Sequence, residues 1–351
     1  MEVIPKQYVP SSPVATPPLN TPPLPPTLSL ARVRFKLVAR EAMPLPAYKG
    51  AVLRGGFGLA LKARACLHPP SDACTPCRMG NACAYGYAFE TSPPPSGGMF
   101  RNLSDVPTPL VFDPPLVPQT VFAPGETLSF DVVLVGRGIG ELPRYVLAFD
   151  ALGAMGLGAR RAPFDVVRVL SMNPWGREAA LVRDGPGDGR PVVADRRMVA
   201  DAEAITARAA GMPRDRLTLR FLTPTRIKHA RAFAGEPGGA HPDLEFHMLV
   251  RALLRRVSAL AICHCDAEWA VDFRAVIAAA EGVRIARSSL IWVEERRYST
   301  RQHQDMHLGG LVDAVTYEGD LAPFLPLLAA GEQVHVGKAA VFGNGRFVVE
   351  R

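Results

Sequence analysis

The sequence contains no uninterrupted run of about 18 apolar residues, the length that a membrane-spanning helix needs. Its N-terminus also lacks the charged and then apolar pattern of a secretory signal. Only six cysteines occur among 351 residues, which does not fit the disulfide framework of a secreted protein. We therefore expect a cytoplasmic protein that does not associate with a membrane.

Lysine is also scarce, since only six of the 40 basic residues are lysines. The formal net charge of +7 favours polyanionic partners, because cations bind phosphates and release their counterions. Arginine suits phosphates and guanine edges through its planar, bidentate donors. A GC-rich genome would give the same arginine excess, so the positions of the charges decide more than their number. Nucleic acid is the partner that we expect.

Residues 1–27 contain nine prolines and few residues to bury. We expect an extended or disordered tail there. The remaining length and the 48% hydrophobic content allow roughly two domains. Residues 171–213 are rich in glycine, proline and charge, which predicts a connection between a domain over 28–170 and another over 214–351.

The two halves repeat one order of secondary structure. After Leu28, apolar residues alternate with Arg32, Arg34 and Lys36, which predicts a half-buried strand whose basic face is solvated or lines a nucleic-acid track. The first half continues with a helix, a strand, a helix and a strand at 46–64, 127–136, 142–152 and 164–170. The second half has expected strands at 217–223, 285–294, 310–317 and near Phe347, and helices at 243–262 and 321–329. This order predicts an α+β fold of tandem ferredoxin-like (RRM-like) βαββαβ domains with antiparallel sheets.

A glycine cluster precedes the last strand of each half, at residues 153–161 and 336–346. Glycine tolerates positive φ and lets backbone amides approach a ligand such as a phosphodiester. Because a strand follows each cluster, neither matches the strand-to-helix placement of a dinucleotide-binding or P-loop motif. The alternative is a tight turn, which explains one glycine better than three.

Four of the six cysteines lie in an insertion over residues 66–83, at Cys66, Cys74, Cys77 and Cys83. The inner pair forms a CxxC turn, which directs two thiolates at one tetrahedral ion. A structural zinc is the default interpretation, while an iron–sulfur cluster or reduced thiols in a local turn remain open. We expect any metal to hold the insertion in place rather than to perform hydrolysis.

Six short motifs of the second half occur in a characteristic order. They are Thr-Pro-Thr-Arg-Ile-Lys (223–228), Arg-Tyr-Ser-Thr-Arg-Gln (297–302), Gly-Gly-Leu (309–311), Tyr-Glu-Gly-Asp-Leu (317–321), His-Val-Gly-Lys (335–338) and Phe-Gly-Asn-Gly-Arg (342–346). Through them the chain resembles the CRISPR precursor-RNA (pre-crRNA) processing endoribonucleases of the RAMP superfamily. The first half is similar more loosely, through residues 53–58, 87–90 and its glycine cluster. Asn344 departs from the family pattern, which more often has an apolar residue between these glycines.

The resemblance implies cleavage of CRISPR repeat RNA by attack of a 2′-hydroxyl on the adjacent phosphate, with no metal cofactor for catalysis. It places a catalytic histidine in or just after the first helix, which selects His68, although His68 could equally be a surface residue or a metal ligand. Tyr48, Arg54 and Lys62 are the expected assistants. The expected RNA contacts are Arg160, Arg161, Arg226, Lys228, His229, Arg301, His335, Lys338, Gly343, Gly345 and Arg346.

Two other functions stay open from the sequence alone. The RAMP superfamily also contains non-catalytic subunits that bind crRNA beside other CRISPR effector subunits, and cleavage of a repeat RNA in chelator would separate the two kinds. A metal or iron–sulfur redox protein would rest on the cysteines alone.

Overall fold

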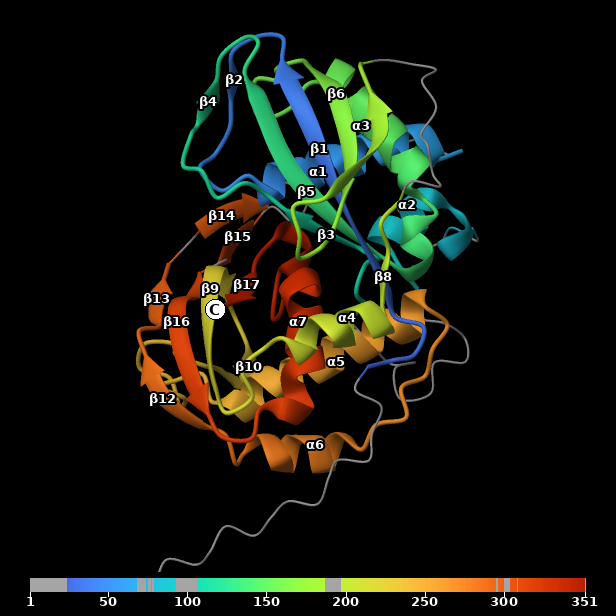
Figure 1. Cartoon of the computed structure of the whole chain (residues 1–351). Helices are drawn as coiled ribbons and strands as arrows, with labels where there is room; N and C mark the ends of the chain where they lie inside the picture. Colours follow the sequence, from blue (N-terminus) through green and yellow to red (C-terminus); the bar gives the residue numbers. More distant parts are fainter. Residues whose placement is uncertain are drawn as a thin grey trace, which may run out of the picture.

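The computed structural model describes residues 24–67, 74, 77, 79–92, 106–186, 197–294, 296–299, 304–307 and 309–350, folded as two α+β domains (Figure 1). Residues 1–23 of the expected tail lie outside these ranges. Leu24 is 3% exposed and packs into the core of the C-terminal domain together with Leu28. The end of the expected tail is therefore ordered, because its leucine finds an apolar environment.

The N-terminal domain is an antiparallel sheet packed against two helices. Its strands are β1 (Ser29–Ala39), β3 (Leu110–Asp113), β5 (Thr127–Val135), β6 (Phe164–Met172) and β7 (Ala179–Asp184), in the spatial order β3-β5-β1-β6-β7. The helices are α1 (Gly50–Ala65) and α3 (Leu142–Met155), which pack on each other (Figure 1). Without β7, this is the order of a βαββαβ ferredoxin-like sheet, with the first strand in the centre.

The alternating pattern of β1 explains how this core forms. Phe35 points inward and its ring lies 4.5 Å from that of Phe149 on α3, whose ring lies 4.7 Å from that of Phe57 on α1. Val33 and Leu37 are also fully buried on this side of the strand. The inward-facing side chains of the strand therefore pack against the apolar side of each helix, and their aromatic rings form one cluster.

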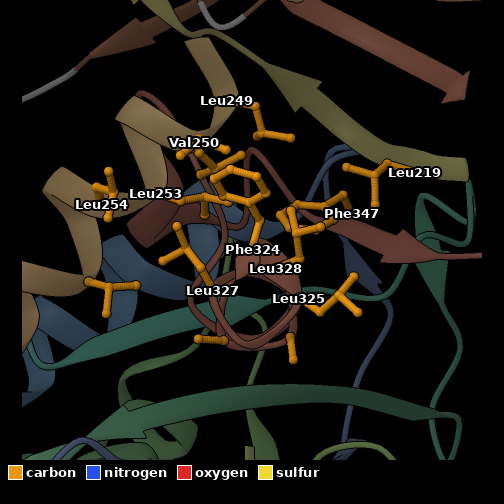
Figure 2. Close-up of a cluster of buried hydrophobic side chains, with 14 of the residues drawn as sticks. Leu219, Leu249, Val250, Leu253, Leu254, Phe324, Leu325, Leu327, Leu328 and Phe347 are labelled. Carbon is orange, nitrogen blue, oxygen red and sulfur yellow. The ribbon is translucent and has the colours of Figure 1, made fainter. Parts of the chain in front are cut away.

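The C-terminal domain repeats this arrangement. Its strands are β9 (Arg216–Thr225), β12 (Arg284–Ser288), β13 (Ile291–Val293), β16 (Gly310–Glu318) and β17 (Phe347–Val349), in the order β12-β16-β9-β17 with β13 also paired to β16. The helices are α5 (Phe246–His264), α6 (Phe273–Ala280) and α7 (Leu325–Val334). Figure 2 shows Leu249 and Leu253 of α5, Leu328 of α7 and Phe347 of β17 in one buried cluster. The tandem duplication expected from the sequence is confirmed.

Three elements lie where the sequence predicted a connection between the domains. Residues 171–213 contain β7, β8 (Ala200–Asp201) and α4 (Ala202–Ala210). Helix α4 packs against α7 of the C-terminal domain (Figure 1). The Asp201 carboxylate begins α4 by accepting a hydrogen bond from the Ala204 N–H at 2.8 Å.

Further short elements include α2 (Ala84–Phe89), β2 (Met43–Pro44), β4 (Val121–Phe122), β10 (Lys228–His229), β11 (Ala232–Phe233), β14 (Arg296–Ser299), β15 (Gln304–His307) and the 3-10 turn η6 (Ala340–Phe342). None of the helices in the described part of the chain is long and apolar enough to cross a bilayer.

Candidate nucleic-acid interface

A cavity of about 480 Å³ lies between the two domains. Its N-terminal wall is formed by α1, α2 and the segment before β3, and its C-terminal wall by the end of β9, β11, α5 and the glycine loop. The lining residues are Arg54, Phe89, Val106, Pro107, Thr108, Arg226, Phe233, Arg256, Gly337, Lys338, Ala339, Ala340, Val341, Phe342 and Asn344. Four of them are cations and three are phenylalanines, and we call this hollow the interdomain cleft.

Arg54 projects from α1 between aromatic rings of both domains. Its guanidinium lies 4.5 Å from the centre of the Phe89 ring and 5.1 Å from that of Phe342. Cation–π contacts of this kind hold a planar guanidinium in place. Arg54, expected from the sequence as an assistant in catalysis, therefore presents a fixed positive charge to the interdomain cleft.

Arg226 occupies the opposite wall, just beyond β9. Its guanidinium stacks 4.3 Å from the Phe233 ring. Its backbone oxygen accepts a hydrogen bond from the Lys338 N–H at 3.0 Å, so the glycine loop runs alongside it. Lys338 and Lys228 are both exposed. The structure thus brings Arg54, Arg226 and Lys338 together from three distant segments.

Arg256 is a fourth cation of the cleft that the sequence did not single out. Its Nε donates to the Val334 carbonyl at 2.6 Å, at the C-terminal end of α7. A cation at this end of a helix satisfies a free carbonyl and interacts favourably with the helix dipole. The sequence does show two adjacent arginines, Arg255 and Arg256, on the polar side of α5, which could have indicated a nucleic-acid contact. Only the fold shows that Arg256 is the one that faces the cleft.

Tyr48 and Lys62 occupy different surroundings. The Tyr48 hydroxyl donates to the Phe342 carbonyl at 2.8 Å, which ties the start of α1 to the glycine loop. Lys62 lies near the other end of α1, with its ammonium 5.6 Å from the Tyr85 ring centre, and does not line the cleft. His68, the expected catalytic histidine, and Arg301 lie outside the described residues.

The C-terminal glycine loop packs against the protein itself. A Cβ added at Gly345 would lie 1.7 Å from the Val336 oxygen, and one at Gly343 would lie 2.5 Å from Cδ of Pro114 in the other domain. Both glycines have positive φ, of +72° and +98° respectively. Gly343 and Gly345 are therefore needed for close packing at the domain junction, whereas the exposed cation of this loop is Lys338.

His335, expected as an RNA contact, is also fully buried beside this loop. Burial, together with the nearby Arg346, Arg32 and Arg256, holds its pKa well below the usual value. The ring is therefore neutral and faces protein, so an influence of His335 on RNA would pass through the loop that follows it.

Arg346, expected to bind RNA, is part of a buried ionic network. Its Nη1 lies 2.6 Å from Oδ1 of Asp113, whose Oδ2 accepts a hydrogen bond from Arg32 at 2.6 Å. Arg32 also donates to Asp131 at 2.9 Å and to Gln333 of α7 at 3.1 Å. The basic face expected for β1 is thus only partly solvated, because Arg32 is 8% exposed and links the domains.

The first glycine loop forms a tight turn at the surface. Leu157 and Ala162 form an isolated antiparallel bridge, and a Cβ at Gly156 would meet the Arg161 oxygen at 2.0 Å. Arg160 and Arg161 are both exposed on this turn, away from the lining of the interdomain cleft. Here the glycines serve the turn, and the arginines are accessible to a polyanion.

His264 is an uncharged, buried residue that hydrogen-bonds to Pro107, one of the residues that line the cleft. Its Nε2 donates to the Pro107 carbonyl at 2.7 Å, so its Nδ1 accepts from the Tyr87 hydroxyl at 3.1 Å. Burial lowers its pKa to about 4. The neutral ring therefore joins the end of α5 to α2 and to the segment before β3.

The cysteines of the insertion lie near one another. Cys66, Cys77 and Cys83 line one hollow of about 350 Å³, and the Cys77 N–H donates to the Cys74 oxygen at 2.9 Å within the CxxC turn. All four thiols are unpaired by disulfides, and burial raises the pKa of Cys74. Among the described residues, no group of three or more His, Cys, Asp or Glu side chains is placed to hold a metal ion. The structural zinc stays a prediction.

Comparisons with known proteins agree with this architecture. Residues 219–347 match the family model of the CRISPR-associated endoribonuclease Cas6, and residues 27–194 match a model described as an N-terminal domain, AF_1859_N. A search of curated proteins gave no match.

Two solved structures share the fold. The chain is similar to the Thermus thermophilus Cas6 TTHB231 in a product complex, with 16% identity, a TM-score of 0.52 and coverage of 92% of this chain and 100% of that one. It is also similar to a chain of a partial Cas6-RT-Cas1–Cas2 complex, with 12% identity, a TM-score of 0.56 and coverage of 93% and 47%.

Proposed function

We propose that the chain is a member of the CRISPR-associated endoribonuclease Cas6 family, whose model matches residues 219–347, and that it binds CRISPR repeat RNA and cleaves precursor crRNA to mature crRNA. The matching family is one of endoribonucleases, which favours cleavage over the alternative of a non-catalytic crRNA-binding subunit. The RAMP fold of two ferredoxin-like domains supports the same assignment.

The observation that carries the proposal is the interdomain cleft. It brings Arg54, Arg226, Arg256 and Lys338 into one hollow from α1, the segment after β9, α5 and the glycine loop. Cations held at one place attract the phosphates of an RNA strand and stabilise the charge of a phosphorane. The partly exposed rings of Phe233 and Phe342 beside them offer surfaces on which unpaired bases can stack.

We further propose cleavage without a metal ion. The 2′-oxygen attacks the adjacent phosphorus while its proton passes to a base, the bond from phosphorus to the 5′-oxygen breaks, and an acid protonates that oxygen. The products are a 2′,3′-cyclic phosphate and a 5′-hydroxyl. Arg54 is suited to stabilise the phosphorane, because its charge is fixed between two rings and points into the interdomain cleft. His68, just after α1, is the residue that we propose for proton transfer.

Incubation of the repeat RNA from the same locus with the purified protein in excess chelator tests this function. We expect cleavage at one position, products with the two ends named above, and no cleavage of a substrate with 2′-deoxyribose at that position. Arg54→Gln should lower the rate constant by about 100-fold, the effect of removing one stabilising donor in other enzymes. Arg144→Gln is the matched control, since Arg144 is exposed on α3 and pairs with Glu141.

Each contrary outcome has a specific meaning. Binding of repeat RNA without cleavage would favour the non-catalytic subunit instead. Cleavage that chelator abolishes would refute the metal-independent mechanism. Full activity of His68→Ala would exclude His68 as the acid or base while leaving the family assignment in place.

A further inference from the structure

Three histidines of the C-terminal domain form a cluster outside the interdomain cleft. His229 lies on β10, His241 lies in the loop before α5, and His247 lies in the first turn of α5. The His229 ring centre is 5.0 Å from that of His241 and 5.4 Å from that of His247. All three side chains are partly exposed. Three imidazoles from separate segments thus share one accessible patch, which we call the histidine cluster.

The hairpin that carries His229 is strained. Ala230 and Arg231 form the two-residue turn between β10 and β11, and both have positive φ, of 43° and 74°. A turn of this type suits glycine or asparagine, and other residues are strained there. Strained backbone often occurs where function requires a fixed geometry. Here it exposes Lys228 and Arg231 beside the histidine cluster.

The groups that act on the charge of His229 are two other histidines and an arginine. Burial lowers the pKa of His229, and His241, His247 and Arg251 lower it further. Asp243 and Glu245, on the segment before α5, act instead on the buried Tyr317. No carboxylate is among the causes of the His229 shift, so an external anion that approaches this ring would favour its protonated form.

Geometry restricts what the occupant can be. In the part of the chain that the structure describes, no group of three His, Cys, Asp or Glu side chains is placed to hold a metal, and this applies to the three histidines. The same hairpin carries Phe233, on which the cleft residue Arg226 stacks at 4.3 Å. A strand leaving the interdomain cleft over Arg226 would therefore meet the hairpin next.

We propose that His229, His241 and His247 form a phosphate-binding site for the RNA backbone that takes up a proton when RNA binds. This inference rests on the proposed function and extends the RNA path beyond the cleft. Protonation gives the cluster a charge that one phosphodiester neutralises, so RNA affinity and proton uptake are linked. Lys228 and Arg231 are exposed cations on the same hairpin.

The experiment measures the Kd of a repeat RNA made uncleavable by 2′-deoxy substitution, at several salt concentrations between pH 5.5 and 8. For the wild type we expect the Kd to rise by up to about tenfold per pH unit on the alkaline side, the linkage of one proton. The slope of log Kd against log salt should be larger by about 0.7–0.9 at pH 5.5 than at pH 8, the contribution of one phosphate contact. The triple variant His229→Gln, His241→Gln, His247→Gln should lose both differences.

Lys228→Gln provides the matched control, because it removes one exposed charge from the same hairpin. It should weaken binding by a similar factor at both pH values and leave the pH dependence intact. If the triple variant does not fold, His241→Gln alone, a loop substitution, should still reduce the pH dependence.

The failure of this inference is distinguishable from the failure of the proposed function. A pH dependence that survives in the folded triple variant, or a wild type whose RNA affinity does not change with pH, would overturn the histidine cluster as a phosphate site. A wild type that binds no repeat RNA at any pH and low salt would instead overturn the function itself.

Discussion

Asp113 joins the two domains through two arginines, and replacing its carboxylate measures how much this junction contributes to stability. The carboxylate is 3% exposed and lies 2.6 Å from both Arg32 and Arg346. We predict that Asp113→Asn destabilises the protein strongly, because it leaves the charges of two arginines without the carboxylate that neutralises them.

The magnitude follows from burial and from the remaining partners. Removing one partner of a buried ion pair costs about 3–5 kcal/mol. Arg32 keeps Asp131 at 2.9 Å, and the Arg346 side chain is 24% exposed, so part of the loss is offset. We therefore expect the free energy of unfolding to fall by about 3 kcal/mol, which lowers the Tm by roughly 5–10 °C.

Urea denaturation followed by circular dichroism tests this value against a matched control. Asp165→Asn removes an equally charged carboxylate from the exposed pair with Arg40, whose side chain is 55% exposed, and should cost less than about 1 kcal/mol. Combining Asp113→Asn with Arg346→Gln should cost less than the sum of the two single changes. Asp113→Asn no more destabilising than Asp165→Asn would refute the reasoning.

Three further predictions concern the junction and its neighbours. Gly345→Ala should lower the free energy of unfolding by at least about 2 kcal/mol, because the added Cβ would overlap the Val336 oxygen and the φ of this residue is positive. Gly55→Ala, with open space around its Cβ, should instead raise the free energy of unfolding by about 0.5–1 kcal/mol in the same denaturation assay. Burial lowers the pKa of His264 to about 4, below the usual 6.5, so the unfolded chain takes up the proton first and stability should fall as pH drops from 6.5 to 4. His264→Gln should remove about 3 kcal/mol of that loss, and an unchanged pH profile of unfolding would contradict the assignment. Tyr48→Phe should lose about 1 kcal/mol of stability with its hydrogen bond to the Phe342 oxygen, yet keep its cleavage rate if the hydroxyl only positions the loop; a large drop in the single-turnover rate would instead support direct participation.

The elements with a strong period were predictable from the sequence. Apolar residues of β1 alternate, and Phe246, Leu249, Val250 and Leu253 of α5 recur at helical spacing and are all buried. These patterns, together with the similar order of strands and helices in the two halves, were sufficient to predict the ferredoxin-like fold.

Other elements carry no such pattern. All four residues of β3, Leu110–Asp113, are buried, so the strand does not alternate and its last position is an acid. The short helix α4 is rich in alanine, and it is stabilised by packing on α7 rather than by an apolar stripe of its own. Because such stabilisation comes from distant segments, local sequence could not show it.

The candidate site was only partly predictable. Motifs singled out Arg54, Arg226 and Lys338, but they could not distinguish a cation that faces a ligand from one held by the protein, as Arg346 is by Asp113. Likewise, a glycine required by a neighbouring backbone and one required by a ligand look alike in sequence, and Gly345 is of the first kind. Long-range contacts decide both questions.

The most direct test of the central claim is the cleavage of the cognate repeat RNA in excess chelator, with the end groups of the products determined. We expect a single cut that leaves a 2′,3′-cyclic phosphate and a 5′-hydroxyl, a rate reduced by about 100-fold in Arg54→Gln, and no cut in the 2′-deoxy substrate. Cleavage of the 2′-deoxy substrate at the same position, or a rate that Arg54→Gln leaves unchanged, would contradict this claim.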